Sequence, residues 1–222
     1  MRVLIYGTSY VGDEGRQWLV EQWAKVNRQI NPDCDLIIVD SASPLPLPEG
    51  VYAHQLCSNL GHLGSTGVDG WGRAFTTGLE IAVEKGYDFV FLIDTDILFF
   101  QPVMSIAFSM AADGQVYGTC EGPPYDWPEG GLVFCSVPWL QATNFPARYD
   151  WQNVRPGTFP ERRLAELAGS KLTTLPLRGR RNDDGLVRPD NIGELFPNGL
   201  DWITHCTDFE VYREALRLNG IS

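Results

Sequence analysis

The segment from Phe89 to Phe100 limits what this chain can fold into more than any other, because two carboxylates interrupt a run of apolar residues there. It reads FVFLIDTDILFF, and without Asp94 and Asp96 it would predict a fully buried strand. On an extended backbone, side chains two positions apart point to the same face, so these two carboxylates are expected to converge. Converging carboxylates repel each other and resist dehydration unless a cation lies between them. A divalent ion is therefore expected, and oxygen ligands favour magnesium or manganese over zinc.

The composition predicts a single soluble domain spanning residues 1–222. With 222 residues, 44% of them hydrophobic, the chain can bury a sizeable core. A net charge of −11 has the wrong sign for binding nucleic acid or an anionic membrane, so an anionic substrate would need a metal, a helix N-terminus or a few arginines. The odd number of scattered cysteines argues against a disulfide framework and favours a cytoplasmic location. No apolar run is long enough for a signal peptide or for a transmembrane segment of ~20 residues.

Strands and helices alternate in the N-terminal half, which predicts parallel strands joined by helical crossovers. A strand at 3–6 leads to a helix over 13–31 and then to a strand at 36–39, and a helix over 71–86 leads directly into the strand at 89–93. We therefore expect an α/β fold with a mostly parallel central sheet flanked by helices. The second half is expected to contain helices near 102–114, 164–169 and 209–218, strands at 116–120, 132–137, 172–177 and 202–205, and a mobile polar loop at 178–191.

This order of elements, with an acidic pair ending a mid-chain apolar strand, resembles the A-type (GT-A) fold of the nucleotide-sugar glycosyltransferases. In that family a DxD motif ends a central strand. Here the motif would be Asp94-Thr95-Asp96, and the preceding GWGRAFTTGLEIAVEKGYDFVFLI resembles the family's helix and strand leading into it. The resemblance implies a nucleotide-binding part at about 1–100 and an acceptor-binding part at about 101–222. It also implies a hexosyltransferase that uses manganese or magnesium to move a sugar from a UDP- or GDP-linked donor to a hydroxyl of a glycan or other acceptor.

The resemblance assigns metal-binding roles to three residues. Asp96 would ligate the ion directly, Asp94 would contact the ribose or the ion through water, and His205 would be a third ligand because it follows a late strand. A structural interpretation remains open for each. The two aspartates could cap a turn or helix, and His205 could be a partly buried histidine satisfied by the backbone.

Three further residues are candidates for binding the nucleotide. Thr8 and Asp40 end the first two strands, at the edge where open α/β sheets hold their ligands. The resemblance suggests that they hold the nucleoside, although turn formation or helix capping explains either residue nearly as well. Arg73, on the helix before the DxD strand, would steady the nucleotide or the acidic pair. Its alternative is an ordinary surface arginine.

The acceptor side depends on Gly130, Gly131 and Glu161. In similar enzymes, small residues at this place let the backbone approach the sugars, whereas a plain turn would also explain the glycines. Glu161 falls where the family often has an acidic residue facing the acceptor, as a base or a hydrogen-bond acceptor. Thr158 to Glu161 also fits a capping box, and Asp183 and Asp184 compete with Glu161 for the acceptor role. Two further sets of residues are candidates. Stacking platforms for acceptor sugars could be provided by Tyr125, Trp127 and Trp151, and a loop folding over the diphosphate could be formed by Arg178, Arg180 and Arg181.

Other functions compete with this interpretation. GTSYVG from Gly7 and the later Asp40 look like the start of an NAD-dependent nucleotide-sugar oxidoreductase, but Ser9 replaces the middle glycine and the acid comes late. A phosphatase of the haloacid dehalogenase type also places DxD after an apolar strand, usually near the N-terminus and followed by a pair such as Gly-Thr. A non-catalytic domain that binds nucleotide sugars or glycans would keep the fold without turnover.

Overall fold

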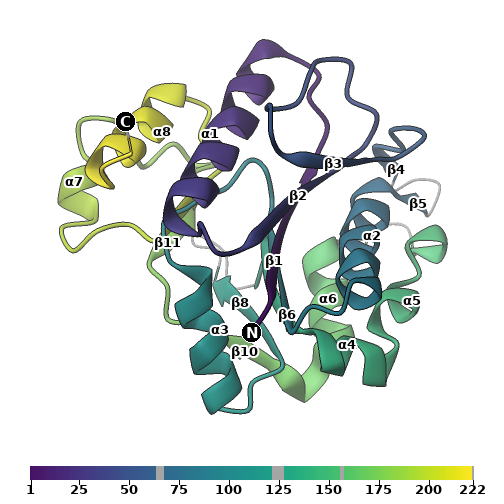
Figure 1. The fold of residues 1–222 in the computed structure, drawn as a ribbon. Coiled ribbons are helices and arrows are strands. Elements are labelled where there is room, and N and C mark those ends of the chain that lie inside the picture. Colours follow the sequence, from purple (N-terminus) through teal and green to yellow (C-terminus); the bar gives the residue numbers. More distant parts are fainter. Residues whose placement is uncertain (64–67, 122–127, 156–157, 222) are drawn as a thin grey trace.

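A seven-stranded sheet forms the centre of the molecule (Figure 1). The computed structural model describes residues 1–63, 68–121, 128–155 and 158–221. Pairing is parallel between β10 and β8, β6 and β1, β1 and β2, and β2 and β3, and antiparallel on both sides of β9, which confirms the predicted mostly parallel sheet. In sheet order the strands are β10 (Leu172–Thr174), β8 (Tyr117–Glu121), β9 (Pro128–Ser136), β6 (Phe89–Ile93), β1 (Val3–Ser9), β2 (Asp35–Asp40) and β3 (Tyr52–Gln55).

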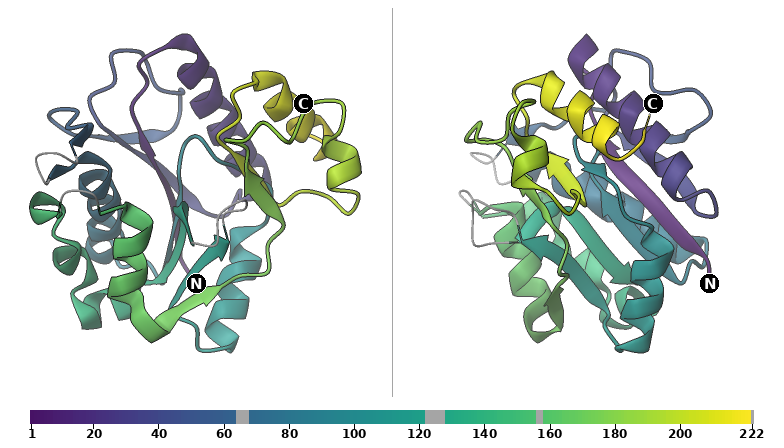
Figure 2. Two further views of the ribbon diagram at one scale, coloured as in Figure 1. Left: turned by 180° about the vertical axis from the view of Figure 1, so that it is seen from behind. Right: turned by 90° about the vertical axis from the view of Figure 1, so that its left-hand side faces the viewer.

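Helices cover both faces of this sheet, giving three layers (Figures 1 and 2). One face packs against α1 (Glu14–Ile30) and α3 (Val103–Ala112), and the core there includes the buried Trp23 and Phe91. The opposite face packs on four helices, and its core includes Tyr6. These helices are α2 (Gly70–Glu84), α4 (Val137–Thr143), α5 (Phe145–Tyr149) and α6 (Pro160–Ala168).

Local sequence signals explain where the two longest helices begin. The Asp13 side chain accepts a hydrogen bond from the Arg16 N–H at the start of α1, and the Asp69 side chain accepts one from the Gly72 N–H at the start of α2. Inside α2, a Cβ atom on Gly78 would lie 2.1 Å from the Tyr6 ring. Only glycine therefore lets this helix approach β1 closely enough to carry its first turn to the sheet edge.

The C-terminal part of the chain forms a smaller unit beside α1. Its three-stranded sheet has the order β11 (Gly179–Arg181), β12 (Trp202–Thr204) and β7 (Leu98–Phe99). The ring of Phe209, the first residue of α8 (Phe209–Leu218), meets that of Trp18 of α1 edge to face at 5.5 Å. Since β7 follows β6 after a short turn, the DxD segment lies where the chain passes from the large sheet to the small one. The remaining elements are β4 (His62–Leu63), β5 (Val68–Asp69), α7 (Ile192–Leu195) and the short 3-10 turns Trp151–Asn153 and Gly169–Lys171.

Several predictions from the sequence were wrong in detail. The expected loop at 178–191 contains β11, and Asn182 after it is buried and bonded through its side chain to both backbone groups of Val187. The strand β3 and the helices α4 and α5 were missed because their segments are short and lack clear periodicity. Tyr125 and Trp127 lie outside the described residues.

Candidate active site

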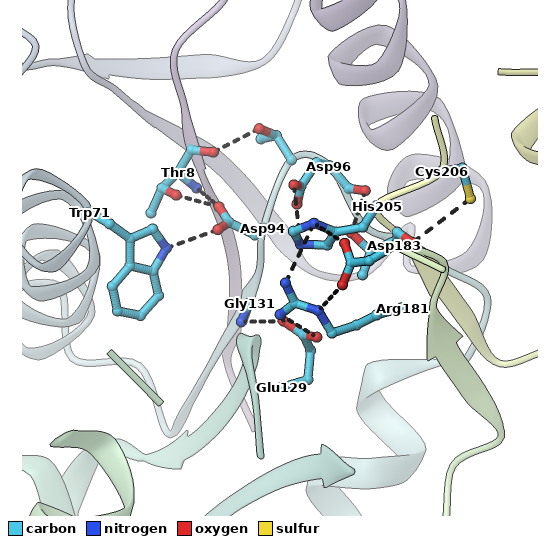
Figure 3. A network of polar contacts seen from close by, with 12 residues as sticks. Thr8, Trp71, Asp94, Asp96, Glu129, Gly131, Arg181, Asp183, His205 and Cys206 are labelled. Atoms are coloured by element: carbon cyan, nitrogen blue, oxygen red, sulfur yellow. Dashed lines mark hydrogen bonds and ion pairs between the residues drawn. The ribbon is translucent and has the colours of Figure 1, made fainter. Parts of the chain in front are cut away.

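The DxD segment forms a turn, not the extended strand that the sequence suggested. The Ile97 N–H donates to the Asp94 carbonyl oxygen at 2.9 Å, while the Asp94 N–H still pairs with the Gly131 carbonyl of β9. This three-residue step between donor and acceptor is the hydrogen bond of a β-turn, so the alternation of a strand does not apply. The two carboxylates nevertheless lie near each other, because the Asp96 carboxylate raises the pKa of Asp94 and both residues line the same cavity. Asp94 points toward β1 and α2, whereas Asp96 points toward α1 and the C-terminal unit (Figure 3).

The Asp94 carboxylate is held by hydrogen bonds on both oxygens (Figure 3). Oδ1 accepts from the Thr8 backbone N–H at 3.1 Å and from the Thr8 hydroxyl, and Oδ2 accepts from the indole N–H of Trp71 at 2.9 Å. Burial, followed by the nearby Asp96 carboxylate, raises the pKa of Asp94, and the donors from Thr8 and Trp71 oppose that rise. Three donors aimed at one carboxylate fix its orientation at the edge of the sheet.

The Asp96 carboxylate lies between two basic side chains from distant parts of the chain. Its Oδ2 atom is 3.9 Å from Nη1 of Arg16 and 3.9 Å from Nε2 of His205. Its backbone is also fixed, because the carbonyl oxygen accepts from the hydroxyls of Thr204 at 2.9 Å and Tyr212 at 3.1 Å. Residues of β12 and α8 thus determine where Asp96 lies.

His205 has a backbone conformation that side chains rarely adopt. Its φ angle is +57°, in the left-handed region that costs energy for residues other than glycine. Its ring is about one-third exposed and faces two carboxylates, with Nδ1 3.1 Å from Oδ1 of Asp183 and Nε2 directed to Asp96. A strained residue held between two acids at a sheet edge is typical of a functional position.

A cavity of about 420 Å³ opens at this edge of the sheet. It lies between the ends of β1 and β6 and the first turns of α1 and α2, with Arg16 as the single lysine or arginine among its described lining residues. Ser9 also lines the cavity, and its buried hydroxyl has no hydrogen-bond partner among the described residues, which is unusual for a buried polar group. The lining carries acidic side chains (Asp13, Asp94 and Asp96), basic ones (Arg16 and His205) and aromatic rings (Tyr10 and Trp71).

Of the nine predicted site residues, the structure brings four to this cavity and leaves five outside its lining. Thr8, Asp94, Asp96 and His205 line the cavity. Arg73 extends instead toward the loop after β3, where its guanidinium donates to the Ser58 hydroxyl at 3.3 Å and to the Cys57 sulfur at 3.5 Å. Asp40 also lies outside the cavity lining.

Asp40 is fully buried and forms a turn. Its carboxylate accepts from the Ser43 backbone N–H at 2.9 Å and from the Ser43 hydroxyl. This is the turn-forming alternative, and an aspartate followed three residues later by serine signals it in the sequence. Because the carboxylate is already bonded, it is not placed to bind a ribose hydroxyl. This weighs against the oxidoreductase interpretation, which needs an acid there.

Gly130 and Gly131 lie at the start of β9, on the other side of the DxD turn. A Cβ atom on Gly131 would be 2.6 Å from Ile97 Cδ1 and 3.0 Å from Asp94 Cβ, so only glycine lets β9 approach this turn. A Cβ atom on Gly130 would be 3.1 Å from the Glu161 side chain. The predicted capping box is not formed, because Phe159 is the N-cap of α6 and Glu161 is turned toward Arg181, 3.9 Å away. The structure therefore places Glu161 beside the two glycines, outside the cavity lining.

Arg181, which the sequence suggested only as a residue folding over the diphosphate, connects the start of β9 with the surroundings of His205. Arg181 ends β11, and its Nη1 atom is 3.3 Å from Oε2 of the buried Glu129, while its Nε donates to Asp183 at 3.1 Å. Burial raises the pKa of Glu129 to about 7, although Arg181 and the Gly131 N–H both favour its charged form. Arg181 thus joins the strand that carries the glycines to the loop that contacts His205 (Figure 3).

Sequence reasoning missed Trp71, Arg16 and Tyr212. The Trp71 ring packs against Phe75 and Tyr149, so an apolar helical pattern accounts for the ring but does not reveal the N–H group that bonds to Asp94. Arg16 follows the N-cap Asp13 by three residues, and a basic side chain in the first turn of a helix opposes the helix dipole, a signal that could have singled it out. Nothing near Tyr212 in the sequence indicates a contact with Asp96.

The residues of the cavity fit a divalent ion with few protein ligands. Among the residues that the structure describes, no three His, Cys, Asp or Glu side chains are arranged to hold a metal. Asp96 and His205 nevertheless offer an oxygen and a nitrogen 3.9 Å apart on one cavity wall. Magnesium and manganese accept such hard or borderline ligands and commonly complete their coordination with water and phosphate oxygens.

Sequence comparison gives no relative, whereas structural comparison does. No model of a protein family matches the chain, and no curated protein matches it.

In the described part of the chain, no helix combines the length and the apolar character needed to cross a membrane.

Three solved structures show the fold. The bifunctional glycosyltransferase WbbM matches with a TM-score of 0.63 and 9% identity over 100% of this chain, which spans 51% of WbbM. A glycosyltransferase involved in glycosylation of the major capsid of PBCV-1 gives 0.56 and 11%, covering 96% of this chain and 97% of that one. The galactosyltransferase LgtC, in complex with donor and acceptor sugar analogs, gives 0.54 and 11%, covering 99% and 95%. This chain therefore has the GT-A fold of the glycosyltransferases.

Proposed function

We propose that this protein is a metal-dependent glycosyltransferase that moves a sugar from a UDP- or GDP-linked donor to a hydroxyl of a glycan or another acceptor. The observation that carries the proposal is the placement of Asp96, His205 and Arg16 around one cavity at the sheet edge. This combination of one carboxylate, one imidazole and one guanidinium suits a diphosphate accompanied by a divalent ion.

The nucleoside would occupy the part of the cavity beyond the carboxyl ends of β1 and β2, within the proposed nucleotide-binding part at 1–100. Ligands of open α/β sheets bind at this edge. The half-exposed Tyr10 ring, which lines the cavity, offers a face to the base. Thr8 contributes indirectly, because it holds Asp94.

Asp96 and His205 would hold manganese or magnesium together with the diphosphate oxygens. Such an ion, when bound, neutralises negative charge on the departing diphosphate. Arg16 adds a guanidinium that can donate to the same oxygens once Asp96 turns to the ion. Asp94, fixed by Thr8 and Trp71, is placed to accept from a donor hydroxyl or from water bound to the ion.

The acceptor would approach from the side of Gly130, Gly131 and Glu161, in the proposed acceptor-binding part at 101–222. The two glycines let the start of β9 lie close to the side chains of Asp94 and Glu161, so an acceptor bound beside this strand would be near both carboxylates. Glu161 lies beside Gly130 and can accept the hydrogen of an acceptor hydroxyl, as a base or as an orienting group. Nη1 of Arg181 lies 3.9 Å from Oε1 of Glu161, on the side of the loop that contacts His205.

Donor hydrolysis and transfer measured with manganese, across a panel of UDP- and GDP-sugars, test this function. The wild-type protein is expected to turn over at least one donor, and D96N is expected to lose both activity and manganese-dependent binding of the nucleoside diphosphate. D190N makes the same chemical change at an exposed site paired with Arg188 and should behave as wild type. Full activity of D96N in the presence of a chelator would refute the metal role. Binding of donors without any turnover would instead indicate a non-catalytic binding domain.

A further inference from the structure

The loop after β11 places a third carboxylate behind His205. Asp183 Oδ1 lies 3.1 Å from Nδ1 of His205, while Nε2 on the other side of the ring faces Asp96 at 3.9 Å (Figure 3). His205 is therefore held between a carboxylate outside the cavity lining and a carboxylate that lines it. The proposed function uses Asp96 and His205, and it leaves Asp183 without a role.

The contact with Asp183 decides which ring nitrogen carries the hydrogen. An ionised carboxylate can only accept, so Nδ1 must be the protonated nitrogen and donate. Arg181 Nη2 lies 3.5 Å from the same nitrogen and would favour the opposite tautomer, but this distance is at the limit of a hydrogen bond. The arginine also interacts with Glu129 at 3.3 Å and Asp183 at 3.1 Å. The shorter contact prevails, and the lone pair of Nε2 is left facing Asp96.

The backbone around Asp183 is fixed independently of His205. The neighbouring Asn182 N–H donates to the Thr204 carbonyl at 2.9 Å, and the Asn182 side chain bonds to the N–H and carbonyl of Val187, both at 2.9 Å. Arg181 then orients the Asp183 carboxylate from the other side. A rigid support is what a strained His205, with its φ of +57°, requires if its ring is to keep one orientation.

We propose that Asp183 is a positioning residue that holds His205 with Nε2 available to a divalent cation beside Asp96. Metal-binding histidines generally donate their second ring N–H to a carboxylate or carbonyl, and loss of such a partner costs roughly 10–100-fold in metal affinity. This inference rests on the proposed function, because it takes Asp96 and His205 as the ligands. It gives Asp183 a role on the metal side in place of the acceptor role that the sequence left open.

Manganese affinity of the full chain tests the inference without measuring activity. The probe is Mn²⁺ added in the presence of saturating UDP or GDP, with free Mn²⁺ followed by electron paramagnetic resonance. D183A is expected to weaken Mn²⁺ binding roughly 10–100-fold. D183N keeps an oxygen that can accept from Nδ1 and should stay within a few-fold of wild type. D184A removes the same charge from the adjacent residue, which pairs with Arg180, and is expected to bind Mn²⁺ as wild type does.

A second measurement reports the tautomer directly. Nitrogen-15 NMR of the His205 ring at pH 8 should show a protonated Nδ1 in wild type and D183N, and a shift toward protonated Nε2 in D183A. Equal Mn²⁺ affinity in D183A and wild type, or equal losses in D183A and D184A, would overturn the positioning role while the metal site still stands. If D96N and H205A also bind Mn²⁺ as wild type does, the proposed metal site itself fails.

Discussion

The Tyr212 hydroxyl lies 3.1 Å from the backbone carbonyl oxygen of Asp96 and donates to it across 116 positions of sequence. The same hydroxyl accepts from the Cys206 N–H at 3.2 Å. One phenol of α8 therefore ties the DxD turn to the loop that carries His205. The relative position of the two proposed metal ligands depends on a side chain that touches neither ligand's functional group.

Replacing Tyr212 with Phe should loosen this connection. The buried Cys206 N–H would lose its acceptor, and the Asp96 carbonyl would keep only the Thr204 hydroxyl. We expect the free energy of unfolding to fall by about 1–3 kcal/mol, measured by urea denaturation, and Mn²⁺ binding to weaken. Y52F alters an exposed tyrosine on β3 and should leave both quantities unchanged. Equal stability of the two variants would show that the Tyr212 hydroxyl contributes nothing.

Arg16 should matter for nucleotide binding more than for folding. In an acidic cavity it supplies a charged donor for the diphosphate, and a hydrogen bond to a charged group contributes about 1.5–3 kcal/mol. R16Q should therefore weaken UDP or GDP binding by roughly tenfold or more in calorimetric titrations with manganese. R213Q removes the same charge from an exposed ion pair on the neighbouring α8 and serves as control. Similar affinities for R16Q and R213Q would exclude a phosphate contact.

Glu129 predicts a pH dependence of stability. Its pKa is raised to about 7 in the folded protein, whereas the pKa of a glutamate in an unfolded chain is about 4.3. Between these values the folded state keeps a proton that the unfolded chain has released, so the free energy of unfolding falls as pH rises through this window. E129Q cannot titrate, so wild type should lose stability relative to E129Q, by about 1–3 kcal/mol, between pH 4.5 and 7. Parallel stability curves for the two proteins would contradict the raised pKa.

A methyl group at Gly131 should disturb the DxD turn. It would lie 2.6 Å from Ile97 Cδ1 and 3.0 Å from Asp94 Cβ, and overpacking of this kind costs about 1–3 kcal/mol. G131A is expected to lower the melting temperature and to reduce any donor turnover. Gly193 has no atom within 4 Å of its Cβ position, so G193A should be neutral or slightly stabilising. A G131A protein with wild-type stability and turnover would mean that the turn moves without consequence.

The sequence predicted the elements whose signals are local. The strands expected at 3–6 and 89–93 and the helix expected over 13–31 lie close to where the structure has β1, β6 and α1. The parallel sheet followed from the order of these elements. The positions of Thr8 and Asp94 at one edge also followed, because the carboxyl ends of the neighbouring parallel strands β1 and β6 meet there. His205 was suggested only by the resemblance, since it follows β12 of the separate small sheet.

The details of the site could not be predicted because they depend on contacts between distant residues. The turn at Asp94 forms where β9 pairs with β6, and no local pattern reveals that pairing. Arg181 was expected in a loop, yet pairing with β12 makes it the end of a strand and directs it to Glu129. Asp40 differs from these, since Ser43 was visible nearby and its turn-forming role could have been preferred from the sequence.

The pairing of β7 with β12 means that the DxD turn can be completed only late in folding during synthesis. The Asp96 carbonyl is bonded by the hydroxyls of Thr204 and Tyr212, which follow it by 108 and 116 positions in the sequence. When Asp96 is synthesised on the ribosome, these two residues and the strand β12 have not yet been made. The nascent sheet can form around β1, β2 and β6, but the corner that holds Asp96 and His205 stays unfinished until α8 has left the exit tunnel. We therefore expect the proposed nucleotide site to become complete only after α8 has emerged and packed against the DxD turn.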